Sequence, residues 1–382
     1  MRKIDIFLFI TTTFYLLSGV NAYTPLPGVY WYSYVLADTK LYFKTEESSN
    51  QLFYLDVSKP FNAVDTSSIP WVDITLTSIP TRNRDAACAG GINNSSIFLF
   101  GGNMDASDPY GLVAQYDIIQ QQWKKPTISG IVPNNKPNSL PCTSTKDGSI
   151  YIFSTDGTTS VSEMNILNTI SLTWSSGSII NAPLRAGVAG FTATLLPDDT
   201  ILYIGGEDTS GDMVSWDKLP LYDIKNDTWN YITTSGDVPS SRKGHTAILA
   251  PDDHIIIIGG SPVSQFIVLD IKTYEWSYPS IDSLNGRPAP KIAYHTATLL
   301  GKYILIGFGY ALDTYQTDIY LMDISDRNNY RWTNLYDPSI SFIILFVVAV
   351  LITIKILNNR YAYVIDPTDD SSIKNRTDNQ HV

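Results

Sequence analysis

The sequence predicts an all-β protein made of six similar units, and three recurring features support this prediction. An apolar residue followed by proline recurs at intervals of 50 to 56 residues, and a tryptophan follows it within each unit. An apolar run ending in Gly-Gly appears in three units, most clearly before Gly259 and Gly260. Short Ile-rich and Tyr-rich runs between these markers are typical of strands, so each unit is expected to hold four. The prolines are Pro27, Pro80, Pro133, Pro183, Pro239 and Pro290, and the tryptophans are Trp71, Trp123, Trp174, Trp229, Trp276 and Trp332.

The apolar runs place the strands of each unit in order along the chain. The first unit, about residues 29–75, is the least regular and lacks Gly-Gly, as terminal repeats often do. The fourth unit contains an unusually long loop over residues 207–220. Expected strands lie at residues 41–43 and 53–55 in unit one, 97–100 and 116–117 in unit two, 150–153 and 167–168 in unit three, 201–204 and 222–223 in unit four, 255–258 and 269–270 in unit five, and 303–306 and 320–323 in unit six.

A period near fifty with four strands, Gly-Gly and a downstream tryptophan closely resembles the kelch repeat over roughly residues 27 to 337. The resemblance implies an all-β, six-bladed β-propeller of four-stranded antiparallel blades over residues 23–337. Such blades bury their apolar faces against their neighbours, which a single blade cannot do alone. The periodic tryptophans are therefore interpreted as packing residues between blades, and the glycines as positions where backbones approach closely.

Composition and charge limit the classes of partner. The 382 residues are 44% hydrophobic, enough for a large core, and the net charge is -11. An acidic protein without a basic patch is not expected to bind nucleic acid. The propeller is expected to be monomeric.

Both ends of the chain carry targeting signals. Arg2 and Lys3 precede an apolar run at residues 6–17, and short residues end at Ala22, so residues 1–22 are predicted to be a secretory signal. Residues 338–357 contain Lys355 as their one charged residue and match the length of one transmembrane helix. Residues 358–382 then form a polar tail, expected to be flexible and cytoplasmic. The propeller would face the extracellular or lumenal side of a plasma or other secretory-pathway membrane.

Three asparagines of the expected ectodomain, Asn93, Asn94 and Asn226, lie in N-x-S/T sequons and are predicted glycosylation sites. Two cysteines, Cys88 and Cys142, fall at matching places in the first strands of units two and three. An even pair in an exported domain favours a disulfide. Two buried free thiols remain the alternative, because the Cα atoms must come within about 7 Å for a bond to form.

Catalytic motifs are not recognised, so a binding function without a cofactor is expected, with an extracellular protein or glycan as partner. The alternative is a membrane-tethered copper oxidase, because kelch propellers are similar at superfamily level to galactose oxidase. That resemblance requires two histidines, for which His245 and His295 stand at matching positions of units five and six. A histidine before Thr also suits ordinary repeat packing, because Phe191 fills the same place in unit four.

The resemblance also indicates where a ligand would bind. On kelch propellers the loops after the Gly-Gly strands and the loops between blades gather on one face. Trp216 is either an aromatic plate for a sugar or a basic protein patch, or a residue that packs the long loop. Arg84 and Arg242 are expected to pair with acids at blade edges. The other ligand candidates are Glu207, Asp208 and Asp212 in unit four and Asp105, Asp108 and Tyr110 in unit two.

Overall fold

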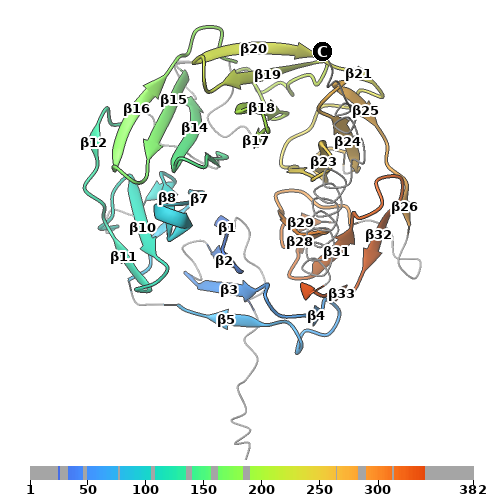
Figure 1. The fold of residues 1–382 in the computed structure, drawn as a ribbon, viewed down its shortest axis with the longest axis horizontal. Coiled ribbons are helices and arrows are strands. Elements are labelled where there is room, and N and C mark those ends of the chain that lie inside the picture. The colour runs from blue at the N-terminus through green and yellow to red at the C-terminus, as the bar shows by residue number, and fades with distance from the viewer. Residues whose placement is uncertain are drawn as a thin grey trace, which may run out of the picture.

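Six antiparallel sheets stand as blades around one central axis in the computed structural model of the chain, which confirms the predicted six-bladed propeller (Figure 1). The structure describes residue 25 and residues 33–45, 50–75, 78–104, 108–134, 140–155, 162–183, 190–263, 265–282, 290–311 and 314–339. The first strand of each blade lines the axis, and the fourth lies at the outer rim. Each blade takes all four of its strands from one stretch of chain.

The predicted strands are present in every blade. From the axis outward, blade one contains β1 (Ser33–Ala37), β2 (Lys40–Lys44), β3 (Leu52–Asp56) and β5 (Trp71–Asp73); blade two β7 (Ala86–Gly90), β8 (Ser96–Phe100), β10 (Val113–Asp117) and β11 (Gln122–Lys124); blade three β13 (Thr143–Ser144), β14 (Ser149–Thr155), β15 (Ser162–Asn168) and β16 (Thr173–Gly177); blade four β17 (Thr192–Leu195), β18 (Thr200–Ile204), β19 (Lys218–Asp223) and β20 (Thr228–Thr233); blade five β22 (Thr246–Leu249), β23 (His254–Ile258), β24 (Ile267–Asp270) and β25 (Glu275–Ser277); and blade six β27 (Thr296–Leu300), β28 (Tyr303–Gly307), β31 (Ile319–Asp323) and β32 (Tyr330–Thr333).

Shorter elements decorate the blades. A fifth strand lies at the outer edge of blades three, five and six. One 3-10 turn, η1 (Ile92–Asn94), joins β7 to β8. The fifth strands are β12 (Ser129–Gly130), β21 (Ser235–Gly236) and β26 (Ile281–Asp282), and the remaining short pairs are β4 (Phe61–Asn62) with β33 (Leu335–Tyr336), β6 (Arg82–Asn83) with β9 (Asn103–Met104), and β29 (Tyr310–Ala311) with β30 (Thr314–Tyr315).

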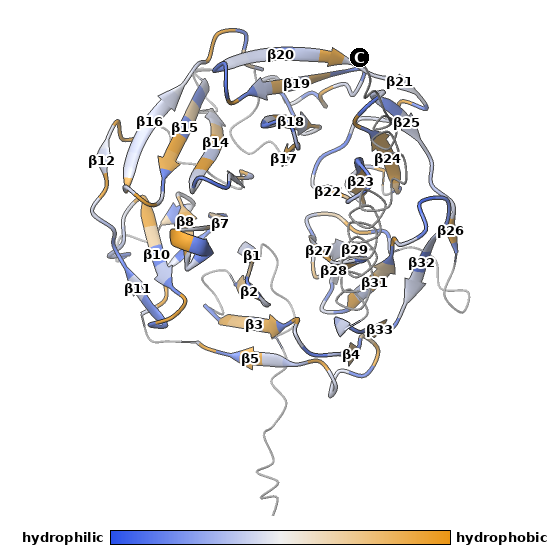
Figure 2. Ribbon diagram, viewed as in Figure 1, coloured by the Kyte–Doolittle hydropathy of each residue, from blue (hydrophilic) through white to orange (hydrophobic). Residues whose placement is uncertain are grey.

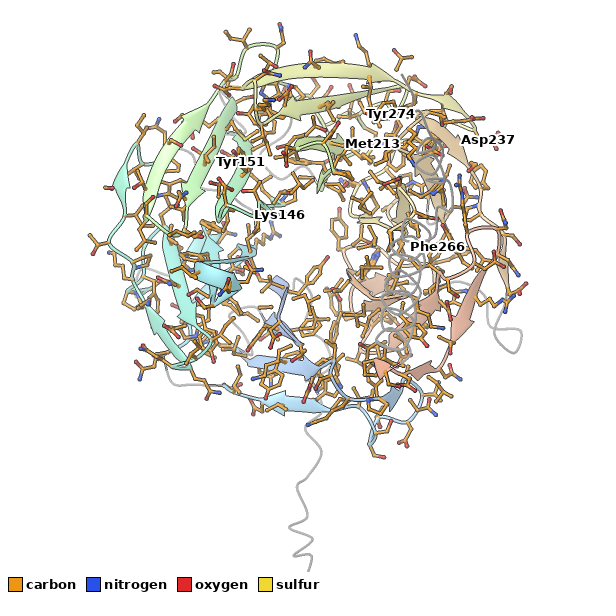
Figure 3. All side chains as sticks on the ribbon, in the orientation of Figure 1. Lys146, Tyr151, Met213, Asp237, Phe266 and Tyr274 are labelled. Carbon is orange, nitrogen blue, oxygen red and sulfur yellow. A yellow bond between two sulfur atoms is a disulfide. The ribbon has the colours of Figure 1, made fainter. Side chains whose placement is uncertain are left out.

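The core lies between neighbouring blades rather than inside any one of them. The second strand of a blade has neighbours on both faces, which is why β18, β23 and β28 are buried along their whole length. The hydrophobic colour follows strands such as β3, β15 and β24 (Figure 2). Side chains fill the space between blades (Figure 3). For example, the ring centre of Phe266 in blade five lies 5.6 Å from that of Trp332 in blade six.

The periodic tryptophans pack between blades, as the repeat predicts. Trp229 of blade four lies 4.8 Å from Phe153 of blade three and 5.1 Å from Tyr203 of its own blade. Trp174 and Trp276 are equally buried. Burial of an aromatic side chain of this size contributes a few kcal/mol to blade association.

The ring closes through contacts between blade six and blade one, a feature that the repeat pattern does not predict. Strand β33 leaves blade six and pairs antiparallel with β4, which belongs to the connection between β3 and β5. The Tyr336 hydroxyl donates to the Val57 carbonyl at 2.8 Å, and at the axis the Tyr34 hydroxyl accepts the Ala297 N–H at 3.4 Å. Aromatic residues of the two blades, including Phe43 and Phe308, form a shared core.

The predicted signal at residues 1–22 and tail at residues 358–382 lie outside the described residues. Of the predicted transmembrane segment, residues 338–357, only Pro338 and Ser339 are described. Within the described ranges, no helix is both long and apolar enough to cross a bilayer.

Candidate ligand site at the mouth of the central channel

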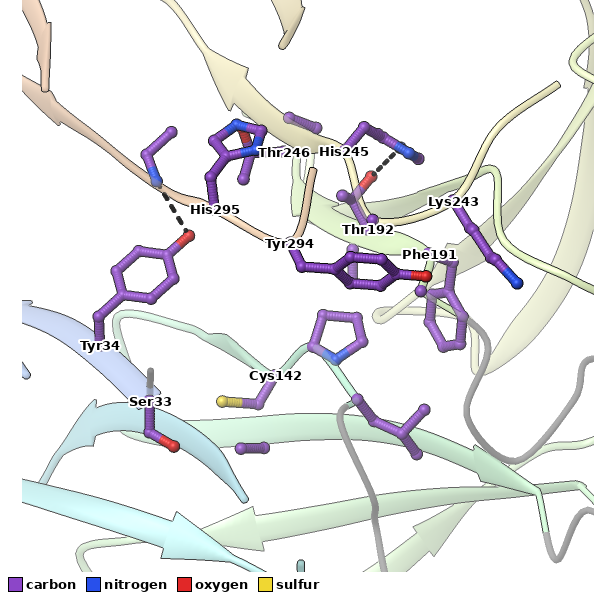
Figure 4. A pocket seen from close by; sticks show the side chains of 18 of the residues that line it. Ser33, Tyr34, Cys142, Phe191, Thr192, Lys243, His245, Thr246, Tyr294 and His295 are labelled. Atoms are coloured by element: carbon purple, nitrogen blue, oxygen red, sulfur yellow. Dashed lines mark hydrogen bonds between the residues drawn. The ribbon is translucent and has the colours of Figure 1, made fainter. Parts of the chain in front are cut away.

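A cavity of about 680 Å³ opens where the central channel meets one face of the propeller (Figure 4). It lies on the face that the kelch resemblance indicates, since its wall includes Lys243 from the loop before β22 and Glu207 from the loop after β18. Every blade contributes to it. Its lining includes Ser33 and Tyr34 from blade one, Arg84 to Ala87 from blade two, Leu140 to Cys142 from blade three, Gly190 to Ala193 from blade four, Gly244 to Ile248 from blade five, and Tyr294, His295 and Ala297 from blade six.

Four equivalent residues at this mouth adopt a left-handed backbone conformation. Each lies two residues before the first strand of its blade: Arg84 (φ 57°), Gly190 (φ 58°), Gly244 (φ 65°) and Tyr294 (φ 52°). Backbone hydrogen bonds link three of them, since Tyr294 N–H donates to the Gly244 carbonyl at 2.7 Å and Gly244 N–H donates to the Gly190 carbonyl at 2.9 Å. This conformation turns the chain from the interblade loop into the axial strand.

Glycine is the natural residue for such a position, so the two side chains found there stand out. A Cβ atom on Gly244 would lie 2.8 Å from the Tyr294 ring, which therefore covers the Gly244 backbone. Holding a residue other than glycine in this conformation costs on the order of 1 kcal/mol or more, and such strain clusters at ligand-binding sites. Blades two and six thus place a side chain at the mouth, Arg84 and Tyr294, where blades four and five have only glycine.

Charged and aromatic groups meet beside the Tyr294 ring. The Lys243 ammonium forms an ion pair with the Glu207 carboxylate, and both side chains are partly exposed at the cavity wall. The hydrogen bond to Glu207 raises the pKa of Lys243. Burial raises the pKa of the Tyr294 phenol, so this hydroxyl stays protonated at neutral pH.

Deeper in the channel, polar side chains join successive blades. The Thr192 hydroxyl lies 3.4 Å from His245 Nε2, and the Thr246 hydroxyl lies 2.8 Å from His295 Nε2. The Ser33 hydroxyl bonds the carboxylate of Asp85 at the corresponding place between blades one and two. A Cβ atom on Gly259 would collide with the Ile292 carbonyl oxygen and lie 2.8 Å from His295 Cε1, so the next blade leaves no room for a side chain here.

The two axial histidines do not fit a copper site of the galactose oxidase type. Both Nε2 atoms are already engaged by threonine hydroxyls. Burial lowers the pKa of His295 to about 3, so its ring is neutral and serves as a packing and hydrogen-bonding group. No three His, Cys, Asp or Glu side chains within the described ranges converge as a metal site would require. The packing interpretation of His245 and His295 agrees with this geometry.

Cys88 and Cys142 form a disulfide between blades two and three. Their Cα atoms lie 6.2 Å apart, within the range that a disulfide needs. Cys142 is part of the cavity wall. Because both sulfurs are bonded to each other, neither cysteine can be joined to a tyrosine, as the copper enzyme would require.

Of the blade-four ligand candidates, Glu207 lines the cavity, whereas Trp216 and Asp208 hold the long loop in place. Glu207 lies at the mouth, but Trp216 is fully buried, 5.3 Å from Trp276 and 5.1 Å from His245. Its ring cannot be the exposed plate considered from the sequence, and the packing alternative accounts for its position. The Asp208 carboxylate accepts the N–H groups of Ser210 and Asp212 and so shapes its own loop.

Of the blade-two candidates, Asp108 and Tyr110 stabilise the fold. Asp105 lies outside the described residues. The Asp108 carboxylate binds the Arg82 guanidinium through two bonds of 2.9 Å, and both side chains are buried. Tyr110 is buried, and its hydroxyl donates to the Ser78 carbonyl at 2.7 Å. These groups fix the loop after β8 rather than meet a ligand.

The expectation that Arg242 pairs with an acid is wrong. Its guanidinium donates to the carbonyls of Gly259 and Gln265 at 3.2 and 2.8 Å and lies 5.2 Å from the centre of the Trp216 ring. Arg84 lies at the cavity wall, and the expectation that it pairs with an acid stays a prediction. Sequence reasoning missed Lys243 and Tyr294. The sequence did offer one signal for this position: Gly190 and Gly244 stand in blades four and five where Tyr294 stands in blade six, and glycine there indicates a left-handed turn.

The fold and its axial cavity define the described part of the chain as a β-propeller with a pocket at the loop face. Residues 190–339 match the family described as the KLHDC2/KLHL20/DRC7 Kelch-repeats domain. The matched residues, which form blades four to six, are therefore kelch repeats, and blades one to three repeat the same four-stranded unit.

Individual relatives agree with this class. The chain is 25% identical over 177 residues to the Rab9 effector protein with kelch motifs of Xenopus laevis, covering 46% of this chain and 47% of the relative. It is 30% identical over 151 residues to Kelch domain-containing protein 1 of Homo sapiens, covering 38% and 35%. The chain thus spans about half the length, or less, of the curated relatives it matches. The solved structure of YjhT superposes with a TM-score of 0.60 at 15% identity, over 81% of this chain and 98% of that one, which supports the fold alone.

Proposed function

We propose that this propeller is a protein-interaction module and that its binding site is the mouth of the central channel. The observation that carries the proposal is the presence of Arg84 and Tyr294 in left-handed conformations at the wall of a 680 Å³ cavity. Pockets that combine an aromatic surface with a few polar groups are the usual sites of recognition. Here the Lys243–Glu207 ion pair and the protonated Tyr294 phenol lie within one wall.

Tyr294→Gly tests this proposal with little disturbance of the fold. Glycine occupies the equivalent position in blades four and five, so it accepts the left-handed backbone without strain. We expect partners cross-linked by the wild-type propeller to be lost with this variant, while the thermal midpoint moves by only a few degrees because relieved strain offsets lost packing. Quantitative cross-linking mass spectrometry and calorimetry measure the two effects.

Two further variants serve as a second test and as a control. Lys243→Glu, which reverses a charge at the same wall, is expected to reduce capture of the same partners. Tyr278→Ala, at a half-exposed tyrosine outside the cavity lining, is expected to leave capture intact. An unchanged partner set for both Tyr294→Gly and Lys243→Glu would contradict a binding site at the mouth.

We further propose that the mouth faces the extracellular or lumenal side of a secretory membrane and meets a protein or glycan there. This rests on the signal and anchor patterns at residues 1–22 and 338–357. Asn93, Asn94 and Asn226 are exposed in turns, where an oligosaccharide has room.

Glycan mapping tests the orientation. We expect Asn226 to carry a glycan. We expect only one of Asn93 and Asn94 to carry one in any molecule, because glycans on adjacent residues would collide. Loss of one glycan unit from the Asn226→Gln variant on a denaturing gel would identify the first site. A glycan on Asn375 together with bare sites at the other three would reverse the proposed topology.

A further inference from the structure

Three blades of the ring carry an additional strand on their outer edge. β12 runs parallel to β16 of blade three, β21 parallel to β25 of blade five, and β26 parallel to β32 of blade six. In each case the strand belongs to the segment that leaves the preceding blade. The outer edge of a blade in this protein is therefore a surface that accepts an extended polypeptide in parallel orientation.

Glycine makes this addition possible in blades three and five. Gly130 and Gly236 have φ values of 90° and 76° and lie beside Trp174 and Trp276. A Cβ atom on either glycine would collide with the carbonyl oxygen of its tryptophan. That oxygen instead accepts the next N–H, from Ile131 at 3.1 Å in blade three and from Asp237 at 2.9 Å in blade five.

The segment that leaves blade three does not add to blade four as its counterparts do in blades three and five, and an isoleucine stands in the place of their glycine. Ser129 and Ser235 each donate N–H to the carbonyl two residues before the tryptophan, whereas Ser178 donates at 2.6 Å to the carboxylate of Asp227, two residues before Trp229. Ile179 follows Ser178 in the glycine position. A β-branched residue resists the left-handed conformation. The chain turns away, with Ala182 N–H donating to the Ile179 carbonyl.

Among the residues that the structure describes, none adds a fifth strand to the outer edge of blade four. β20 has six residues, against three in β25 and five in β16, and no strand pairs with its outer side within the described ranges. β20 runs along the outer rim of the ring (Figure 1). Ile179 and Ile180, in the segment that bonds Asp227 and Trp229, are 49% and 75% exposed. Proteins usually cover or shorten such edges, since an exposed edge with apolar neighbours recruits another strand.

We propose that the outer edge of β20 is a second docking site, which binds an extended segment of a partner protein as the fifth strand of blade four. The fifth strands of blades three and five specify this occupant, and β26 of blade six shares their parallel direction but lacks the glycine. The occupant runs parallel to β20, has glycine beside Trp229, and places an apolar residue toward Ile179 and Ile180. Main-chain bonds give such strand addition its affinity, and the glycine gives it selectivity. The site lies on the outer rim, away from the central mouth, so either proposal can fail alone.

A peptide with the sequence of residues 126–132, Pro-Thr-Ile-Ser-Gly-Ile-Val, is the probe. We expect the fluorescently labelled peptide to bind the whole protein at least tenfold more tightly than the same peptide with isoleucine in place of glycine. Its addition should slow amide hydrogen exchange in β20. Equal affinity for the two peptides, or no binding of either up to millimolar concentration, would overturn the proposal.

Ile179→Gly is the decisive variant. It recreates the Ser-Gly-Ile sequence of residues 129–131 in the segment beside blade four, so the protein's own chain should cover β20. We expect peptide affinity to fall at least tenfold and the β20 amides to be protected without peptide. Ile179→Val, which remains β-branched, should bind as the wild type does. Undiminished binding by Ile179→Gly would show that the peptide sits elsewhere and would refute the docking site.

Discussion

Replacement of Trp216 by alanine is expected to lower the free energy of unfolding by about 3–5 kcal/mol, the usual cost of removing a large buried aromatic side chain. The Trp216 ring is fully buried and lies against Trp276 and His245. It also supports Arg242, whose guanidinium lies 5.2 Å from the ring centre. The variant would therefore leave a cavity between blades four and five and remove the aromatic partner of a buried cation. Chemical denaturation followed by fluorescence measures the loss.

Two comparisons separate this packing role from ligand binding. Trp216→Phe keeps an apolar ring and is expected to lose less than half as much stability. Tyr278→Ala, at a half-exposed tyrosine, is expected to change stability by less than about 0.5 kcal/mol. If Trp216→Ala kept wild-type stability but lost the captured partners, the ring would be a ligand contact and the packing interpretation would be wrong.

The periodic residues were sufficient to predict the ring. A tryptophan near every fiftieth residue and an apolar run before Gly-Gly each mark a contact that repeats between neighbouring blades. The interval between Trp229 and Trp276 and the interval between Trp123 and Trp174 each correspond to one blade. Counting such intervals along the chain therefore predicts the number of blades. Even the irregular first unit has its four strands in order, with β2 and β3 at its two apolar runs.

The closure of the ring and the mouth of the channel could not be predicted in the same way. β33 pairs with β4 across more than 270 residues, and neither strand belongs to the repeat. The left-handed turn at the mouth is marked by Gly190 and Gly244, but Tyr294 in the same position carries no signature of its own. A repeat identifies what all blades share, whereas a binding site depends on where one blade differs.

Non-periodic residues are also where the sequence leaves alternatives open. Trp216 and Asp108 stand outside the repeat and were candidate ligand contacts, and packing of the long loop was the other alternative for Trp216. In the structure they hold long loops onto the blades, since a loop after the second strand can bury a tryptophan or an ion pair of its own. Arg82, the partner of Asp108, was missed although it stands four residues before β7, as Arg242 stands four residues before β22.

The Asp108→Ala variant is expected to destabilise the propeller by about 3–5 kcal/mol, because it leaves a buried guanidinium without its carboxylate. Arg82 and Asp108 have side chains that are 0% and 1% exposed and are joined by two bonds of 2.9 Å. The carboxylate also accepts the Tyr110 N–H at 2.8 Å, so the loop would lose its anchor as well as the charge pair. Differential scanning calorimetry at neutral pH measures the change.

The double variant Arg82→Met with Asp108→Leu isolates the cost of the unpaired charge from the cost of lost packing. Apolar residues of similar volume need no compensating partner, so the double variant should recover much of the stability that either single variant loses. In blade five the equivalent arginine, Arg242, has no carboxylate partner among the described residues and donates from Nη1 to the carbonyls of Gly259 and Gln265, beside the Trp216 ring. If the carbonyls of Gly101 and Gly111 could satisfy Arg82 in the same way, Asp108→Ala would cost less than about 1 kcal/mol, and the ion pair would not be what holds the loop of blade two.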